Sequence, residues 1–83
     1  MKKRDEVMMI GKDIIRTAIK ERGVKQRDLA EQLGMLQSSL SMNISREHIS
    51  LDMFGRILNG MGYAVAVIDK DDGGVRWVVD TDA

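Results

Sequence analysis

Hydrophobic residues recur at helical spacing over the first 62 positions of the chain. They return every three or four positions, with polar and charged residues between them, which predicts amphipathic helices that pack on one another. The second of these segments is so short that it needs its neighbours to be stable. The four expected helices are about Asp5–Arg22, a segment opened by Lys25–Asp28 and stopped by Gly34, Gln37 to about Ile44, and a segment capped by Ser50 and ended by Gly60 and Gly62.

The hydrophobic pattern changes after Gly62. Tyr63–Ile68 and Val75–Val79 are rich in β-branched and aromatic residues, and Asp69–Gly74 between them is rich in turn formers. This arrangement predicts a β-hairpin with a loop of more than two residues. We therefore expect a mostly α fold with a small β element. Residues 1–62 form its helical unit, and residues 63–83 form a hairpin that belongs to the same compact unit or to a dimer interface.

The segment Gln26–Ser45 meets the steric requirements of two short helices that cross at a steep angle. A small residue, Ala30, stands where the helices approach each other. Gly34 stands in the turn, where a positive φ is needed. Apolar residues flank these points and can attach the pair to the rest of the domain: Leu29, Leu33, Met35 and Leu40.

In register with these features, Gln26–Met35 resembles the start of the Cro/phage-repressor-type (XRE-like) helix-turn-helix, and Gln37–Ser41 resembles its recognition helix. Ile49–Gly62 is similar to the next helix of that family, so the resemblance covers about residues 15–62. It implies a four-helix DNA-binding domain and a sequence-specific transcriptional regulator of the repressor type that binds double-stranded DNA. The hairpin lies outside the common core of the family.

The chain departs from the family pattern in three places. Leu36 stands where a Ser or Thr N-cap is usual, so the third helix is expected to lack a side-chain cap. Asn43 stands where an apolar core residue is usual, and Ile44 is expected to take the core position instead. The Glu-x-Gly that often follows the recognition helix is absent from Ser45–His48.

The outward side of the third helix carries side chains suited to reading base edges in a major groove. The Gln37 amide can pair with adenine N6 and N7, while Ser38 and Ser41 can hydrogen-bond to several bases. Met42, together with Leu36, can contact a thymine methyl group. The alternative interpretation of these residues is an ordinary solvated helix face.

Phosphate contacts would position the domain without reading sequence. By resemblance, Gln26 meets a phosphate at the start of the second helix, where the helix dipole favours an anion. Lys25, Arg27 and Arg46 are the further candidates, and each could also be a plain surface charge. The charge is unevenly distributed in a way that suits this hypothesis: Met1–His48 has a net charge of +3 and Ile49–Ala83 one of −3.

The hairpin offers more apolar surface than a helical unit of this size readily covers. We expect Val65 and Val67 to lie on one side of its first strand and Val75, Trp77 and Val79 on one side of its second. An exposed apolar hairpin favours pairing with another chain, so we predict a homodimer. Two recognition helices would then lie about 34 Å apart, one turn of DNA. The competing expectation is a monomer whose hairpin folds back on its own helices.

Composition excludes several other classes of function. The chain has 13 Lys and Arg, 13 Asp and Glu, one histidine and no cysteine, which disfavours an enzyme and predicts no catalytic residues, no cofactor and no metal. Asp69, Asp71 and Asp80 match part of a calcium-loop spacing, but the flanking strands and Gly73 favour a turn. No apolar run is long enough to span a bilayer, so we expect a cytoplasmic protein without a membrane partner.

Two other functions remain open from the residues alone. The first is an antitoxin, in which the DNA-binding unit also holds a toxin partner. The second is a protein-interaction module that keeps the fold but has lost DNA binding, for which Leu36 and Met42 on the outer face would be suited.

Overall fold

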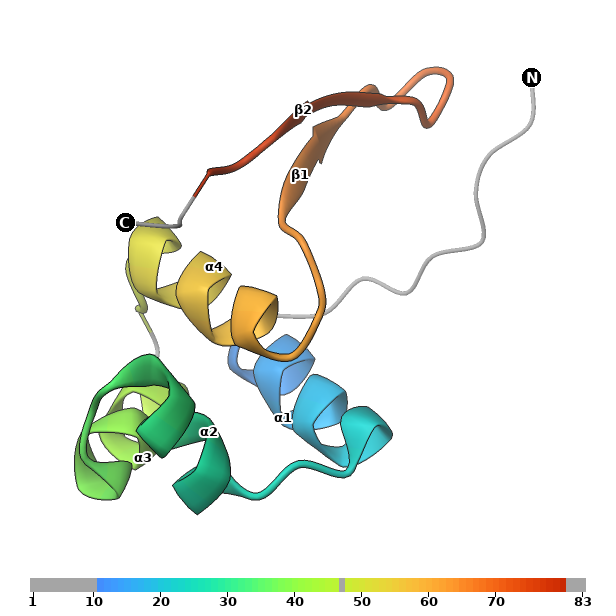
Figure 1. Ribbon diagram of the computed structural model, residues 1–83. Helices are drawn as coiled ribbons and strands as arrows, with labels where there is room; N and C mark the ends of the chain where they lie inside the picture. The colour runs from blue at the N-terminus through green and yellow to red at the C-terminus, as the bar shows by residue number, and fades with distance from the viewer. Residues whose placement is uncertain (1–10, 47, 81–83) are drawn as a thin grey trace.

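Four helices and a two-stranded antiparallel hairpin form this mostly helical domain. The computed structural model describes residues 11–46 and 48–80 of the 83-residue chain (Figure 1). The expected beginning of the first helix, residues 5–10, lies outside this range. The elements are α1 (Gly11–Arg22), α2 (Gln26–Leu33), α3 (Gln37–Ser45), α4 (Leu51–Gly60), β1 (Ala66–Ile68) and β2 (Val75–Val78).

One hydrophobic core joins the four helices. Its largest fully buried side chains come one from each helix: Ile15, Leu29, Leu40 and Ile57. Ala30 is 1% exposed in α2, as expected for the small residue at a close helix approach. Ile44 is 2% exposed, which confirms that it takes the core position in α3 in place of Asn43. The core thereby fixes which side of each short helix faces solvent.

The turn between α2 and α3 depends on the backbone conformation of Gly34. This residue adopts φ 70° and ψ 33°, the left-handed conformation that only glycine takes without strain. The Gly34 amide donates to the Glu31 carbonyl, and the Met35 amide donates to the Ala30 carbonyl. These bonds satisfy carbonyl groups at the end of α2, and α3 begins only three residues later. The expected role of Gly34 is confirmed.

Two side chains attach the carboxyl end of α2 to α4. Arg56 donates a 3.3 Å hydrogen bond to the Leu33 carbonyl, and Gln32 donates a 3.0 Å hydrogen bond to the Gly60 carbonyl. Gly60 allows this approach, because a Cβ atom there would lie 3.2 Å from the Leu29 side chain. These contacts with α4 therefore hold in place the turn that leads into α3.

The start of α4 and the start of α3 are built differently. The Ser50 hydroxyl accepts a 3.1 Å hydrogen bond from the Met53 amide, so the expected cap of α4 is confirmed. Leu36 precedes α3 in an extended conformation and makes no side-chain cap bond. The first turn of α3 thus keeps its outward amide groups uncapped by a side chain, as the sequence predicted.

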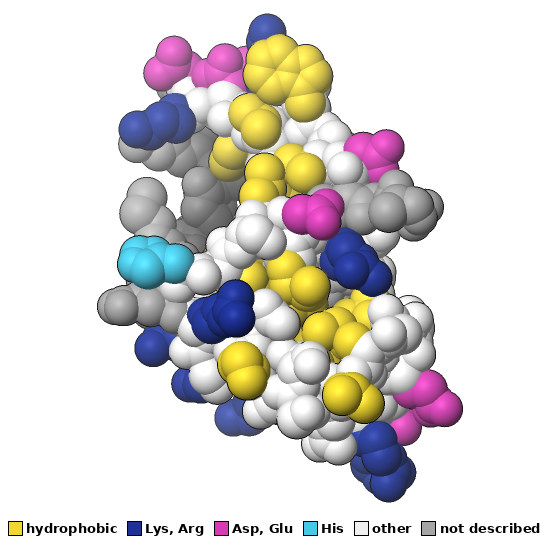
Figure 2. Space-filling model, turned by 90° about the vertical axis from the view of Figure 1, so that its left-hand side faces the viewer, with side chains coloured by type: hydrophobic (Ala, Val, Ile, Leu, Met, Phe, Trp, Pro, Cys, Tyr) yellow, Lys and Arg dark blue, Asp and Glu magenta, His cyan; other side chains and the backbone are white. Residues whose placement is uncertain are grey.

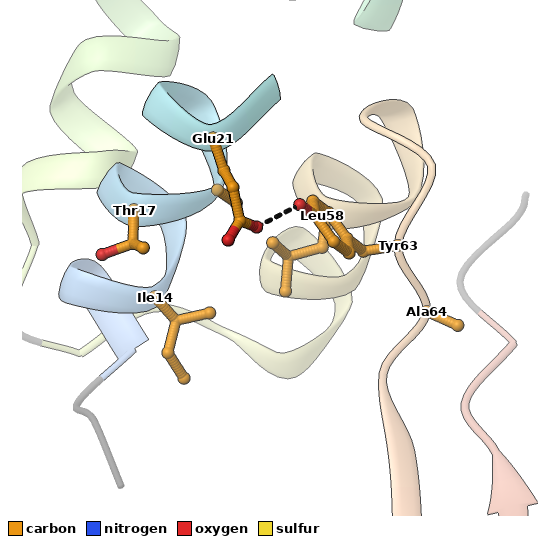
Figure 3. Close-up of a pocket in the computed structure, with 7 residues that line it drawn as sticks. Ile14, Thr17, Glu21, Leu58, Tyr63 and Ala64 are labelled. Atoms are coloured by element: carbon orange, nitrogen blue, oxygen red, sulfur yellow. Dashed lines mark hydrogen bonds between the residues drawn. The ribbon is translucent and has the colours of Figure 1, made fainter. Parts of the chain in front are cut away.

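Tyr63 joins the hairpin to α1 and does not begin a strand. Its hydroxyl donates a 2.6 Å hydrogen bond to Glu21, and the Arg22 guanidinium lies 4.2 Å from the centre of its ring. Figure 3 shows Tyr63 and Glu21 pointing toward each other. Both line a cavity of about 230 Å³ between α1 and α4. The expectation of a strand from Tyr63 is therefore wrong: β1 begins at Ala66, after the chain has packed on the helices.

The hydrogen bond to Glu21 is the main reason why the pKa of Tyr63 is raised above its ordinary value, with desolvation as the second cause. The bond is intact below pH 10 and is lost as the pH rises through the raised pKa. We expect absorbance titration of this chain, which has one tyrosine, to give a higher pKa than a denatured sample. Glu21→Ala, which removes the acceptor, should lower the pKa toward the denatured value. An unchanged pKa in that variant would contradict the assigned cause.

The hairpin has an irregular register. Ala66 pairs with Val78 and Val67 with Trp77, but Ile68 pairs with Val75, so Arg76 is an extra residue in β2. This bulge places Val75 opposite Ile68 and off the face that Trp77 occupies. The expectation that Val75 shares a side with Trp77 and Val79 is therefore wrong. The sequence pattern assumed an uninterrupted alternation, which the bulge breaks.

The loop of the hairpin is closed by its own polar groups. The Asp69 carboxylate accepts a 2.8 Å hydrogen bond from the Asp71 amide, and the Asp72 carboxylate accepts one of 2.7 Å from the Gly74 amide. The Asp69 amide also donates to the Gly74 carbonyl. These carboxylates stabilise a turn, which is the interpretation favoured over a calcium loop.

Candidate functional site

The outer surface of α3 is the candidate site, because the core leaves it open. Leu40 and Ile44 point inward and are buried. The four candidate base-contacting residues are all exposed: Gln37, Ser38, Ser41 and Met42. Leu36 and Met42 are the two large apolar side chains of this surface, with 72% and 59% exposed. The helix thus has one face buried in the core and another open to solvent.

Ser45 belongs to the same surface. The sequence predicted the third helix from Gln37 to about Ile44, and Ser45 is the last residue of α3 and is exposed. Positions 38, 41, 42 and 45 follow one another at the three- and four-residue spacing of a single helix face. The outer face therefore extends one turn further than expected.

Asn43 does not contribute to this face. Its side-chain amide donates a 2.9 Å hydrogen bond to the Ser39 carbonyl one turn earlier in α3. That bond satisfies a half-buried polar group within the helix. The polar side chain of Asn43 is therefore accommodated at this half-buried position by a hydrogen bond within α3.

No charged residue lies within α3, and this sets the electrostatics of the surface. Figure 2 shows the corresponding side of the molecule: the lower part, over α2 and α3, is mostly uncharged, with basic groups around it and an acidic group at one edge. An anionic ligand would meet no carboxylate on α3 itself. It would meet uncharged hydrogen-bonding groups, with cations at the margin.

The candidate phosphate-contacting residues lie at the ends of α2 and α3. Lys25 and Arg27 are exposed at the start of α2, and Arg46 is exposed just after α3. Arg27 lies 3.9 Å from Asp28, a contact between two well-exposed side chains that leaves the guanidinium accessible. Gln26 differs from the others because it is half-buried at the first position of α2.

Arg56 is the main positioning residue that sequence reasoning missed. It lies on α4 and supports the end of α2 through the Leu33 carbonyl. Nothing in the local sequence distinguishes it from a surface arginine. Only the packing of α2 on α4 gives it a partner.

The residues expected at a dimer interface fall into two groups, one at the root of the hairpin and one in its outer part. Val65 packs against the helical core, and Val79 lies beside it at the root of the hairpin. Both line a cleft of about 350 Å³ with Val78 and with Gly55 and Asn59 of α4. Val67, Val75 and Trp77 lie further out and are exposed. The root therefore belongs to the domain, and the outer part of the hairpin is available for contact.

Within residues 11–46 and 48–80, no cluster of His, Asp and Glu side chains is arranged to hold a metal ion. None of the helices in that range is both long enough and apolar enough to cross a bilayer. Comparison with protein-family models, curated proteins and solved structures finds no match to this chain.

Proposed function

We propose that this chain binds double-stranded DNA sequence-specifically, with α3 in the major groove, and acts as a transcriptional regulator of the repressor type. The observation that carries the proposal is the division of α3 into a buried side and an exposed, uncharged, hydrogen-bonding side. The α2–turn–α3 pair, held by Gly34 and Arg56, would serve as the helix-turn-helix.

The dimensions of α3 suit a groove. An α-helix with its side chains is about 10–12 Å across, and the major groove of B-form DNA is about 12 Å wide. Short uncharged side chains such as Ser38 and Ser41 let the helix axis approach the base edges. Gln37 is the first residue of α3, and recognition helices make base contacts with their N-terminal residues.

The marginal cations would supply the part of affinity that does not depend on sequence. Lys25, Arg27 and Arg46 would each neutralise a phosphate, and each contact adds about −0.9 to the slope of log K against log salt. We therefore expect a slope of about −3 for one chain on a duplex. The amino end of α2 would add a phosphate contact through Gln26 and its backbone amides.

Replacing Gln37 with alanine tests whether this residue reads a base. Duplexes that bind the full-length chain are first selected from a random pool. On the selected site we expect Gln37→Ala to cost about 1–3 kcal/mol, or about 5- to 150-fold in Kd, with little effect on random duplex. Fluorescence anisotropy with labelled duplexes at two salt concentrations gives both values.

Gln26→Ala is the matched control, because it removes the same amide from a position assigned to a phosphate. It should weaken binding to the selected and random duplexes by similar factors. Equal losses on both duplexes for Gln37→Ala would show that Gln37 does not read bases. An absence of binding even at low salt would overturn the proposed function.

A second candidate function is supported by one observation, the exposure of Leu36 and Met42 on the outer face of α3. Two large apolar side chains surrounded by polar ones are also typical of a protein-binding surface. That candidate predicts no salt-dependent binding to DNA, so the anisotropy titration distinguishes the two.

A further inference from the structure

The outer part of the hairpin is apolar and has no helix behind it. All four residues of β2 are exposed, and the single tryptophan of the chain, Trp77, is 66% exposed. Figures 1 and 2 show the hairpin extending beyond the helices, at the end of the molecule away from α2 and α3. A two-stranded hairpin is marginal in water unless its apolar face is covered. The molecule therefore carries a surface that a partner would stabilise.

The strand register identifies which face is the better contact surface. The Val79 amide donates to the Val65 carbonyl, and Val67 pairs directly with Trp77, so these four residues share one face. Val65 is anchored in the core, which fixes the orientation of this face. Val67 and Trp77 continue it outward as an aromatic and β-branched pair. On the opposite face, the bulge at Arg76 interrupts the regular surface around Val78.

Charge indicates what kind of chain could cover this face. Residues 1–62 contain eleven Lys and Arg and eight Asp and Glu, a net charge of +3, whereas residues 63–83 contain two and five, a net charge of −3. Three of the carboxylates lie in the loop at the tip of the hairpin: Asp69, Asp71 and Asp72. In Figure 2, both acidic and basic groups border the hydrophobic ones at the hairpin end. A hairpin of this kind complements the helical unit of its own sequence.

We propose that the face formed by Val67 and Trp77 packs against the same face of a second copy of this chain, with the two hairpins antiparallel about a two-fold axis. In this orientation each acidic tip lies toward the basic helical unit of the other copy, whereas a parallel arrangement would bring the two acidic tips together. A two-fold axis also makes the contact closed, since each copy uses the same surface. The inference does not depend on DNA binding by α3.

The size of the patch limits its strength. Two or three apolar side chains per copy expose a few hundred Å² at most, below the roughly 800 Å² per partner of standard stable interfaces. The dimer should therefore dissociate on dilution, in about the micromolar range. For the proposed function, a weak dimer would mean that binding to a two-fold symmetric DNA site assembles it.

Trp77 provides a direct readout, because it is the one tryptophan. We expect light scattering to show a dimer of the full-length chain at high concentration and a monomer on dilution. The emission maximum of tryptophan should move to longer wavelength over the same concentrations, as the indole becomes exposed to water. Both measurements use protein without DNA.

Val67→Asp and Val78→Asp are a matched pair of variants. They make the same substitution at exposed positions on opposite faces of the hairpin. Val78 also lines the cleft beside α4, but it is the more exposed of the two, at 60% against 45%. We expect Val67→Asp to raise the dimer dissociation constant about tenfold or more and Val78→Asp to change it little. Val67→Thr and Val78→Thr repeat the comparison without a charge, and circular dichroism identifies any variant that has lost its fold.

Three results would overturn the inference. The first is a monomer at every concentration up to about 1 mM. The second is a loss of dimer that is equal or greater in the Val78 variants, which would show that exposure rather than the Val67–Trp77 face determines contact. The third is a dimer that dissociates without any change in tryptophan emission, which would place the interface elsewhere.

Discussion

Replacing Leu40 with alanine is expected to lower the free energy of unfolding by about 2–5 kcal/mol. Leu40 is fully buried where α3 meets the core, and the smaller side chain would leave a cavity there. A chain of 83 residues has a total stability of about 4–12 kcal/mol, so this single change removes a large part of it. Thermal unfolding followed by circular dichroism measures the effect, at about 4–8 °C for each kcal/mol.

Met42→Ala is the control for this experiment, because it shortens a large apolar side chain two residues away in the same helix. Met42 is 59% exposed, so its loss should change stability by no more than about 0.5 kcal/mol. A Leu40 variant that is as stable as the Met42 variant would contradict the assignment of inner and outer faces to α3.

Replacing Gly34 with valine is expected to cost about 1–3 kcal/mol. No atom outside its immediate neighbours lies within 4 Å of where a Cβ would be, so a larger side chain meets open space. The cost comes instead from the backbone, because a β-branched residue strongly disfavours φ 70°. Denaturant unfolding gives the loss as a shift of the midpoint.

Gly34→Asn separates these two causes. Asparagine tolerates the left-handed conformation better than other residues with a side chain, although, like valine, it is much larger than glycine. It should therefore retain most of the stability that valine loses. If asparagine and valine are equally destabilising, a steric clash rather than the backbone conformation limits this position.

Much of the helical part of the fold could be predicted from the sequence because its signals are local. Gly34 is a glycine where a left-handed turn is needed, and Ser50 is a hydroxyl residue where a helix begins. Leu40 and Ile44 lie one helical turn apart, so the inner face of α3 follows from spacing alone. Gln37, Ser38 and Ser41 lie on the other side of the helix, so their exposure follows from the same spacing.

The hairpin was predicted less well because its details depend on residues far apart in the chain. Tyr63 is a typical strand residue, yet it packs on α1, where its hydroxyl donates to Glu21, 42 positions away in the chain. The bulge at Arg76 shifts one strand against the other, and no local pattern marks it. Arg56 was missed for the same reason, since its partner Leu33 lies on another helix.

The separation of α3 into two faces has an evolutionary consequence. Side chains at positions 37, 38, 41, 42 and 45 project into solvent and support no other part of the domain. Mutations there are nearly neutral for folding, whereas the two inward residues tolerate little change. Natural variation could therefore rewrite what this helix prefers to bind, one residue at a time, while every intermediate remains a folded protein.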